Sequence, residues 1–297
     1  MSNTSRAVLA ATAAAALLFW KTHHRSSSDH GPMRSATWEW AGPAEPGSWV
    51  RVRNLNGRVR VDSTGDATLA VSALKHWRHG DADDVRLVVA REGDDTYVCA
   101  LYHGRSERSG ECGEHYGSFS GRRRHQPWLW RLLGGRASDM SVEFTVHLPK
   151  GVKLDASTVN GAVTVDGATG EVRARTVNGA ITAHTSIGPI NAGTVNGSIR
   201  VRMDSLAGTG DVTLATVNGS VVAELPETFD GDVDLSTVNG SFKSDFPTTV
   251  SGRIDPHHLH ATIGDGGRQL TMKTVNGSVA LRKISERAGR PVAEREP

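Results

Sequence analysis

Three histidines close together are the first candidates for metal chemistry in this chain. His257, His258 and His260 lie in the segment Asp255–His260, and imidazole is a frequent metal ligand. No carboxylate or cysteine is spaced to complete a coordination sphere with them. The nearby run Gly264–Gly267 has the composition of a calcium-binding glycine repeat, but it occurs once, and such sites need stacked copies. We therefore expect a solvated loop and no metal site.

The sequence contains none of the motifs that announce a hydrolase, a metalloprotease or a nucleotide-binding enzyme. G-x-S-x-G, H-E-x-x-H, a Walker loop and a Rossmann fingerprint are all missing. A polysaccharide-cleaving enzyme would need paired carboxylates. The candidates for such a pair fall at turns or at alternate positions where charge is solvated: Asp155, Asp166, Asp211, Asp232 and Asp234. We expect no catalytic residue and no cofactor.

The two cysteines of the chain, Cys99 and Cys112, are candidates for one local disulfide. Cys99 lies within a strand-like run, Thr96–Tyr102, and Cys112 follows in a loop rich in Ser, Gly and Glu. A bridge is favoured if the protein is exported, because oxidising compartments retain disulfides. The alternative is a pair of unlinked thiols. The spacing does not fit a zinc site.

Residues 103–138 interrupt the strand pattern and carry the densest group of arginine and tryptophan in the chain. One interpretation is a membrane or partner contact through 121–136, in which Trp inserts and Arg pairs with anionic headgroups. The other is a loop whose Trp and Leu pack over the fold while its Arg side chains are solvated. The contact residues would be Arg122, Arg123, Arg124, Trp128, Trp130 and Arg131.

The elements that must position all of these residues are set by a repeat. The tetrapeptide Thr-Val-Asn-Gly (TVNG) occurs six times between Thr158 and Gly277. Its Asn residues are separated by 18, 18, 22, 21 and 37 residues. A period of about 20 residues indicates stacked repeats. Apolar and polar residues alternate on both sides of each Asn-Gly, which is typical of strand, turn and strand.

Two architectures fit this pattern. In a right-handed β-solenoid of about 20-residue coils, each Asn-Gly is a corner, and each strand pairs with its counterpart in the next coil. In a meander of β-hairpins, each Asn-Gly is an autonomous turn. We favour the all-β solenoid, because stacking explains why every corner has the same residues. Small inward-facing residues such as Val172, Ala174, Ile181 and Ala183 suit a thin coil.

In the solenoid, the corner Asn side chains would stack and hydrogen-bond as a ladder. Sequence order puts Asn218 in the middle of that ladder and Asn276 near its end. Glycine at the corner would permit positive φ. The ladder residues are Asn160, Gly161, Asn178, Gly179, Asn196, Gly197, Asn218, Gly219, Asn239, Gly240, Asn276 and Gly277.

The repeats resemble the exported "putative adhesin" β-solenoid proteins of bacteria, a DUF4097-like group of unknown function. The TVNG copies carry the resemblance, together with Leu148-Pro149, Leu225-Pro226 and the stretch Ile263–Leu270. It covers most of residues 36–283. It implies an exported solenoid and says almost nothing about activity.

The N-terminus has the features of an export signal. Arg6 precedes the apolar run Ala7–Trp20, which is shorter than the roughly 20 residues of an ordinary membrane-spanning helix. An uncleaved anchor and an organelle transit peptide are the alternatives. We expect signal or anchor and linker over 1–35, an N-terminal β region over 36–149, the solenoid over 150–283 and a flexible tail over 284–297. In the first region, Leu55-Asn56-Gly57 is a degenerate copy of the repeat, and Trp38, Trp40 and Trp49 would cap the stack.

Composition excludes some partners. Lys and Arg number 34 against 32 Asp and Glu, so nothing in the overall charge indicates nucleic-acid binding. We expect a non-catalytic, adhesin-like module in the periplasm, at the cell surface or anchored to the membrane. Its partners would be an envelope protein, a glycan or a second copy. The alternatives are an envelope-stress or signalling component that binds a regulator or lipid, and a polysaccharide-active β-helix enzyme.

Overall fold

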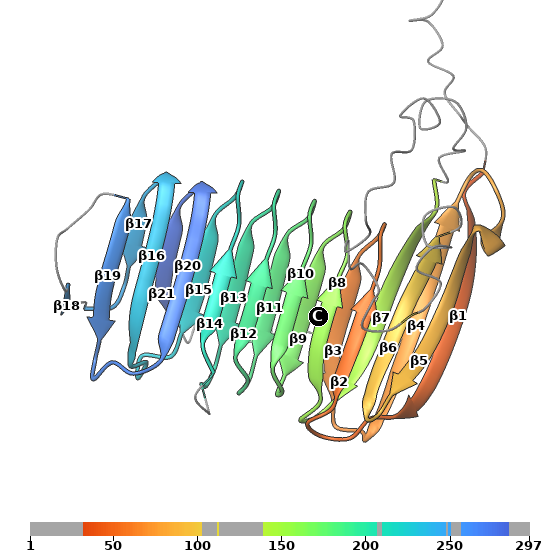
Figure 1. Cartoon of the computed structure of the whole chain (residues 1–297), viewed down its shortest axis with the longest axis horizontal. Helices are drawn as coiled ribbons and strands as arrows, with labels where there is room; N and C mark the ends of the chain where they lie inside the picture. The colour runs from red at the N-terminus through yellow and green to blue at the C-terminus, as the bar shows by residue number, and fades with distance from the viewer. Residues whose placement is uncertain are drawn as a thin grey trace, which may run out of the picture. The chain divides into compact units, whose positions relative to one another are not determined.

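The computed structural model describes residues 32–102, 112, 139–206, 210–247, 249–250 and 257–284. Nearly all of these lie in one compact unit, Arg34–Pro297. They form 21 strands in two sheets, with one short 3-10 helix, η1 (Ala82–Asp84) (Figure 1). The predicted all-β class is confirmed.

The two sheets face each other along the length of the stack, and each regular coil contributes one strand to each sheet. Sheet A contains, in spatial order, β1 (Arg34–Pro43), β4 (Thr68–Trp77), β7 (Ser141–Pro149), β3 (Val59–Thr64), β9 (Val163–Ala168), β11 (Ile181–Thr185), β13 (Ile199–Met203), β15 (Val221–Leu225), β21 (Val279–Lys283) and β17 (Phe242–Ser244). Sheet B contains β18 (Thr249–Val250), β19 (His258–Ile263), β16 (Gly231–Asn239), β20 (Gln269–Asn276), β14 (Val212–Ala215), β12 (Ile190–Gly193), β10 (Val172–Arg175), β8 (Lys153–Ser157), β2 (Trp49–Arg53), β6 (Asp95–Tyr102) and β5 (Val85–Glu92).

Equivalent residues of successive coils pair in parallel, which confirms the solenoid and rules out the hairpin meander. In sheet A, Val163 pairs with Ile181, Ile181 with Ile199, and Ile199 with Val221. In sheet B, Leu154 pairs with Val172 and Val172 with Ile190. The expected degenerate copy also stacks, since Asn56 bridges Asn160. Residues 49–64 are therefore continuous with the TVNG coils through β2 and β3.

The core is a single column between the sheets. Every second residue of each strand points into it, so small aliphatic side chains from consecutive coils lie on one another. The expected inward-facing residues Val172, Ala174, Ile181 and Ala183 are buried, and Phe242 in the short strand β17 is partly buried. Coils this thin bury enough apolar surface only through their neighbours.

The Asn side chains at the corners form a continuous ladder of hydrogen bonds. Each side-chain amide donates from Nδ2 to Oδ1 of the neighbouring Asn at 2.7–2.9 Å. The predicted ladder is confirmed, and it has seven rungs in the described structure because Asn56 joins it. In spatial order, the rungs are Asn56, Asn160, Asn178, Asn196, Asn218, Asn276 and Asn239.

The last two copies of the repeat are stacked out of sequence order. β20 lies between β14 and β16 in sheet B, and β21 lies between β15 and β17 in sheet A (Figure 1). Asn276 does lie near the end of the ladder, but it is the last rung but one and not the terminal rung that sequence order predicts. Asn276 is bonded to Asn218 on one side and Asn239 on the other, and Asn239 is the end rung. The antiparallel strand β19 returns along the outer side of β16 before the chain enters this internal position.

The other residues of the tetrapeptide also have defined places. Each Thr is buried, and its hydroxyl donates to the carbonyl of the corner Gly in the neighbouring coil, as Thr176 does to Gly161 at 2.8 Å. Five of the Val side chains are exposed, by 38–55%. They form a row along the outside of the corner: Val177, Val195, Val217, Val238 and Val275.

Glycine is required at the corner mainly because neighbouring backbones approach closely there. A Cβ on Gly197 would lie 1.9 Å from the carbonyl oxygen of Gly179, and one on Gly179 would lie 2.0 Å from that of Gly161. Positive φ, the reason expected from the sequence, occurs at only two of the six TVNG glycines, Gly219 (152°) and Gly277 (155°). For the corner glycines as a set, the predicted reason, positive φ, is therefore replaced by the close approach of neighbouring backbones.

Antiparallel strands close both ends of the stack. At one end, β1 pairs with β4 and β4 with β7, and the partly buried Trp38 and Trp40 of β1 pack against the core, as expected for a cap. At the other end, β19 covers β16. Such caps terminate a ladder of open backbone groups that would otherwise pair with another chain. Trp49 does not join the cap and lies on the outer face of sheet B.

Replacement of a corner glycine should be far more damaging than replacement of a glycine on an open face. Gly197→Ala forces the backbone of two coils apart, and we expect a loss of about 3 kcal/mol in the free energy of unfolding or failure to fold. The matched control is Gly193→Ala in β12, where a Cβ would meet nothing closer than 3.9 Å. Urea denaturation of both variants measures the difference. Equal stabilities would contradict close approach as the reason for the corner glycines.

Candidate functional site

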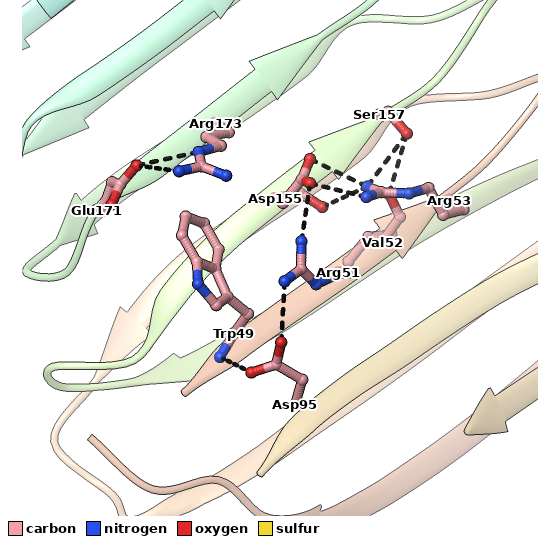
Figure 2. Close-up of polar contacts among 9 residues, drawn as sticks. All are labelled: Trp49, Arg51, Val52, Arg53, Asp95, Asp155, Ser157, Glu171 and Arg173. Atoms are coloured by element: carbon pink, nitrogen blue, oxygen red, sulfur yellow. Dashed lines mark hydrogen bonds and ion pairs between the residues drawn. The ribbon is translucent and has the colours of Figure 1, made fainter. Parts of the chain in front are cut away.

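The outer face of sheet B carries the most elaborate polar arrangement in the described structure (Figure 2). The alternation that buries Val50 and Val52 turns Trp49, Arg51 and Arg53 of β2 outward. β8 and β10 stack on β2 in register, so their outward residues fall beside these three. We call this group the Trp49 cluster: Trp49, Arg51, Arg53, Asp95, Lys153, Asp155, Glu171 and Arg173.

Asp155 is the centre of the Trp49 cluster. Its side chain is only 5% exposed and lies between two arginines. Arg53 donates both terminal nitrogens to the carboxylate, at 3.0 and 2.7 Å, and also donates to the Asp155 carbonyl at 2.9 Å. Arg51 approaches the same carboxylate at 3.6 Å. A carboxylate buried to this degree needs such paired charges, because alone it would be strongly disfavoured.

Asp95 fixes the other side of the Trp49 cluster. Its carboxylate accepts hydrogen bonds from the Arg51 guanidinium and from the backbone N–H of Trp49, both at 2.9 Å. Burial alone would lower the pKa of Arg51, but the hydrogen bond to Asp95 and the neighbouring charges outweigh it and raise the pKa. Arg51 is therefore a permanent cation held in one orientation.

Cations surround the Trp49 ring. The guanidinium of Arg173 lies 4.3 Å from the ring centroid, that of Arg51 lies 5.2 Å away, and the Lys153 ammonium lies 5.6 Å away. Glu171 holds Arg173 through contacts of 2.9 and 3.0 Å. These cation–π contacts and ion pairs fix an indole on the rigid face of three successive strands.

A second polar group, the His184 cluster, lies on the outer face of sheet A. His184 of β11 contacts Asp166 of β9 through Nδ1 at 2.9 Å and Asp204, which follows β13, through Nε2 at 2.5 Å. Arg202 also pairs with Asp204 at 2.9 Å. Burial would lower the pKa of His184, but the hydrogen bonds to Asp204 and Asp166 and their charges raise it.

The residues singled out in the sequence have different outcomes. Cys99 and Cys112 are joined by a disulfide with a Cα–Cα distance of 5.8 Å, which confirms the predicted bridge. Arg122, Arg123, Arg124, Trp128, Trp130 and Arg131 lie outside the described residues, so the proposed contact through 121–136 stays a prediction. Cys112, the one described residue of that insertion, is buried beside Tyr97 and Leu101 over the outer face of β6.

Asp232 and Asp234 share the outer face of β16, whereas the other candidate carboxylates are not paired with them by the fold. Asp155 and Asp166 lie on the outer faces of different sheets, and each is engaged by a basic side chain. Asp232 accepts hydrogen bonds from Thr262 and from the backbone of Gly267, so the glycine run 264–267 contacts the neighbouring strand β16. Among the described residues, no three His, Cys, Asp or Glu side chains gather as metal ligands.

The sequence contained a signal for the Trp49 cluster that single-strand reasoning missed. Aligned by their corners, the coils place Arg51, Asp155 and Arg173 at one position of three successive strands. A buried carboxylate between two arginines is visible in that alignment as a charge alternation across coils. Read along one strand, Asp155 is simply an outward-facing charge.

These features define a class: a capped β-solenoid with a Thr, Asn and Gly corner ladder and charged outer faces. Residues 135–282 match the family model of Toastrack DUF4097. Through these residues, about half of its length, the chain belongs to the Toastrack DUF4097 family, and the resemblance expected from the repeats is confirmed. No curated protein matches the chain in sequence.

Solved structures with a similar trace include three bacterial proteins. A "putative cell adhesion protein" from Clostridium sporogenes is 9% identical, with a TM-score of 0.44 over 84% of this chain and 100% of the other. A "putative adhesin" from Bacteroides fragilis is 9% identical, with a TM-score of 0.28 over 84% of this chain and 97% of the other. One from Parabacteroides distasonis is 8% identical, with a TM-score of 0.25 over 86% and 98%. Because these identities and TM-scores are low, the family assignment rests on residues 135–282 alone.

Within the described ranges, no helix has the length and apolar character needed to span a membrane.

The His184 cluster should make stability depend on pH. The folded-state pKa of His184 is raised, so the imidazolium contributes stability below the unfolded value of about 6.5, and this contribution is lost as pH rises through the folded pKa. We expect the free energy of unfolding of wild type to exceed that of His184→Gln by at most about 1 kcal/mol at pH 5.5, and by less at pH 8.5.

Urea denaturation at both pH values measures this difference. The pKa of Asp204 is lowered, since its bonds to His184 and Arg202 outweigh burial, so Asp204 stays ionised across this range. In an Asp204→Asn background, the effect of His184→Gln should depend less on pH. If the stabilisation of the fold by His184 grew between pH 5.5 and pH 8.5, the stabilising role given to the imidazolium would be contradicted.

Proposed function

We infer that this chain is an exported, non-catalytic binding module of the cell envelope, adhesin-like in that it presents a rigid surface to a partner. The observation that carries the inference is the stacked architecture itself. Seven bonded Asn rungs and two in-register sheets hold the outer side chains in a fixed array. Because each outer position repeats from coil to coil, such a face suits an extended partner better than a small enclosed substrate.

Two further features support export. The Cys99–Cys112 bridge fits an oxidising compartment, where disulfides persist. The N-terminal pattern of Arg6 followed by the apolar run Ala7–Trp20 is that of a secretory signal or an anchor. Periplasm, cell surface and membrane anchorage are the locations that fit these features.

The charged outer faces support binding as the activity of the module. Arg51, Asp155 and Arg53 are held rigidly in the Trp49 cluster by mutual contacts, so binding to this face orders few additional side chains. A preorganised surface loses less conformational entropy when it binds. The fold thus provides what an adhesive or scaffolding module needs.

Fractionation of cells expressing the tagged full chain tests the proposal. We expect the protein in the envelope or external fraction, with Cys99 and Cys112 joined in one non-reduced peptide detected by mass spectrometry. Deletion of the gene should reduce attachment of cells to surfaces or to one another, and re-expression of the wild-type chain should restore it. A cytosolic protein with both cysteines alkylated would refute export. Unchanged attachment after deletion would refute the adhesive role.

A further inference from the structure

The Trp49 cluster carries more positive charge than its own carboxylates neutralise. Asp95, Asp155 and Glu171 are engaged by Arg51, Arg53 and Arg173. Lys153 and Arg175 lie on the same outer face, and neither forms an ion pair with a carboxylate among the described residues. Lys153 contacts the Trp49 ring, and Arg175 is exposed. Two cations are therefore available to an external anion.

The surface beside Arg175 is flat and open. In register across the stack, Arg53, Ser157, Arg175 and Gly193 occupy one row of sheet B. Gly193 has no side chain, and no heavy atom outside its immediate chain neighbours lies within 3.9 Å of where its Cβ would be. Small residues continue the face at Thr213 and Ala215, paired with Asn191 and Gly193. An extended ligand can therefore lie across the strands and reach the Arg175 guanidinium.

We propose that this surface, the Trp49 cluster with Arg175, binds an acidic polysaccharide, so that Arg175 and Lys153, which lies against the Trp49 ring, pair with its carboxylates. Arg binds carboxylates in a planar, two-pronged geometry. This proposal rests on the proposed function, since an exported module is the one that meets such polymers.

The charge pattern along sheet B favours a sparsely charged glycan over nucleic acid or lipid. Cations concentrate on β2, β8 and β10, while the outward residues of β16 include Asp232 and Asp234. A polymer with a phosphate at every step would meet these acids, whereas protein surfaces that bind nucleic acid are basic throughout. A lipid surface takes up protruding apolar side chains, and Trp49 is half-buried among cations.

Titration calorimetry of the purified, oxidised full chain tests the proposal. The probes are octamers of galacturonate, alginate and hyaluronan, a fully methyl-esterified galacturonate octamer, and vesicles of phosphatidylglycerol and phosphatidylcholine. We expect at least one acidic octamer to bind, with binding weakened by salt and lost in the ester. Arg175→Ala should weaken that binding about tenfold, the loss of one charge-assisted contact.

The matched control is Arg282→Ala, an exposed arginine on β21 in sheet A, which should bind like wild type. Trp49→Ala should also weaken binding, because the Trp49 ring holds Lys153 in place, and circular dichroism shows whether the variant folds. If it does not fold, the comparison of Arg175 with Arg282 decides the question. Failure of all three acidic octamers, equal binding of the ester, equal losses in both arginine variants, or binding to vesicles alone would each overturn the proposal.

Measurements on the same purified protein distinguish failure of the glycan proposal from failure of the proposed function. An exported protein with an intact Cys99–Cys112 bridge that binds no acidic octamer overturns only the glycan assignment. A cytosolic protein with free thiols overturns the proposed function, whatever the octamers show.

Discussion

The spacing between neighbouring coils is the constraint on which the rest of this structure depends. Parallel strands lie about 4.8 Å apart, and the corner brings the backbones of adjacent coils into direct contact. Gly is the residue that fits there, Asn bonds to the Asn above and below, and the Thr hydroxyl donates to the neighbouring Gly carbonyl. The tetrapeptide is repeated because each copy makes the same contacts to the copies beside it. Small inward side chains follow, since two sheets joined by such tight corners enclose a narrow column.

The same constraint sets what the outer faces can do. Because every coil is in register, an outward residue has a fixed neighbour in the coils on either side, and charges on separate segments of the sequence become adjacent. Arg53 and Asp155 are about a hundred residues apart in the chain and yet form a buried bidentate ion pair. The Trp49 cluster is thus a product of stacking, and its rigidity comes from the corner ladder. Function, in this account, lies in a repetitive surface that is preorganised for an extended partner.

Much of the fold could be predicted from the sequence because the corner contacts are encoded locally. The period, the alternation and the identity of Asn at each corner specify a solenoid, and the Asn56 copy followed from the same reasoning, whereas the disulfide followed from the two cysteines and the expected export. The position of the sixth copy could not be predicted, because identical corners are interchangeable and TVNG does not specify which copy is its neighbour. The 37-residue gap before Asn276 was the one sign in the sequence that this copy departs from the regular stacking order. The sequence predicts that Trp49 lies in the cap. Its contacts with the cations of β8 and β10 can be recognised only when the coils are aligned with one another.

Crosslinking of the exposed corner valines tests the stacking order most directly. The backbone N–H of Val275 donates to the Val217 carbonyl at 3.3 Å, so these residues are on adjacent rungs, whereas Val238 is one rung further away. Adjacent rungs place Cα atoms about 4.8 Å apart, within the range of a disulfide, and two rungs exceed it. After mild oxidation, peptide mapping of Val217→Cys/Val275→Cys should show a new linked peptide beside the native Cys99–Cys112 one, and Val217→Cys/Val238→Cys should show free thiols. A 217–238 bridge without a 217–275 bridge would mean that the copies stack in sequence order and would contradict the account.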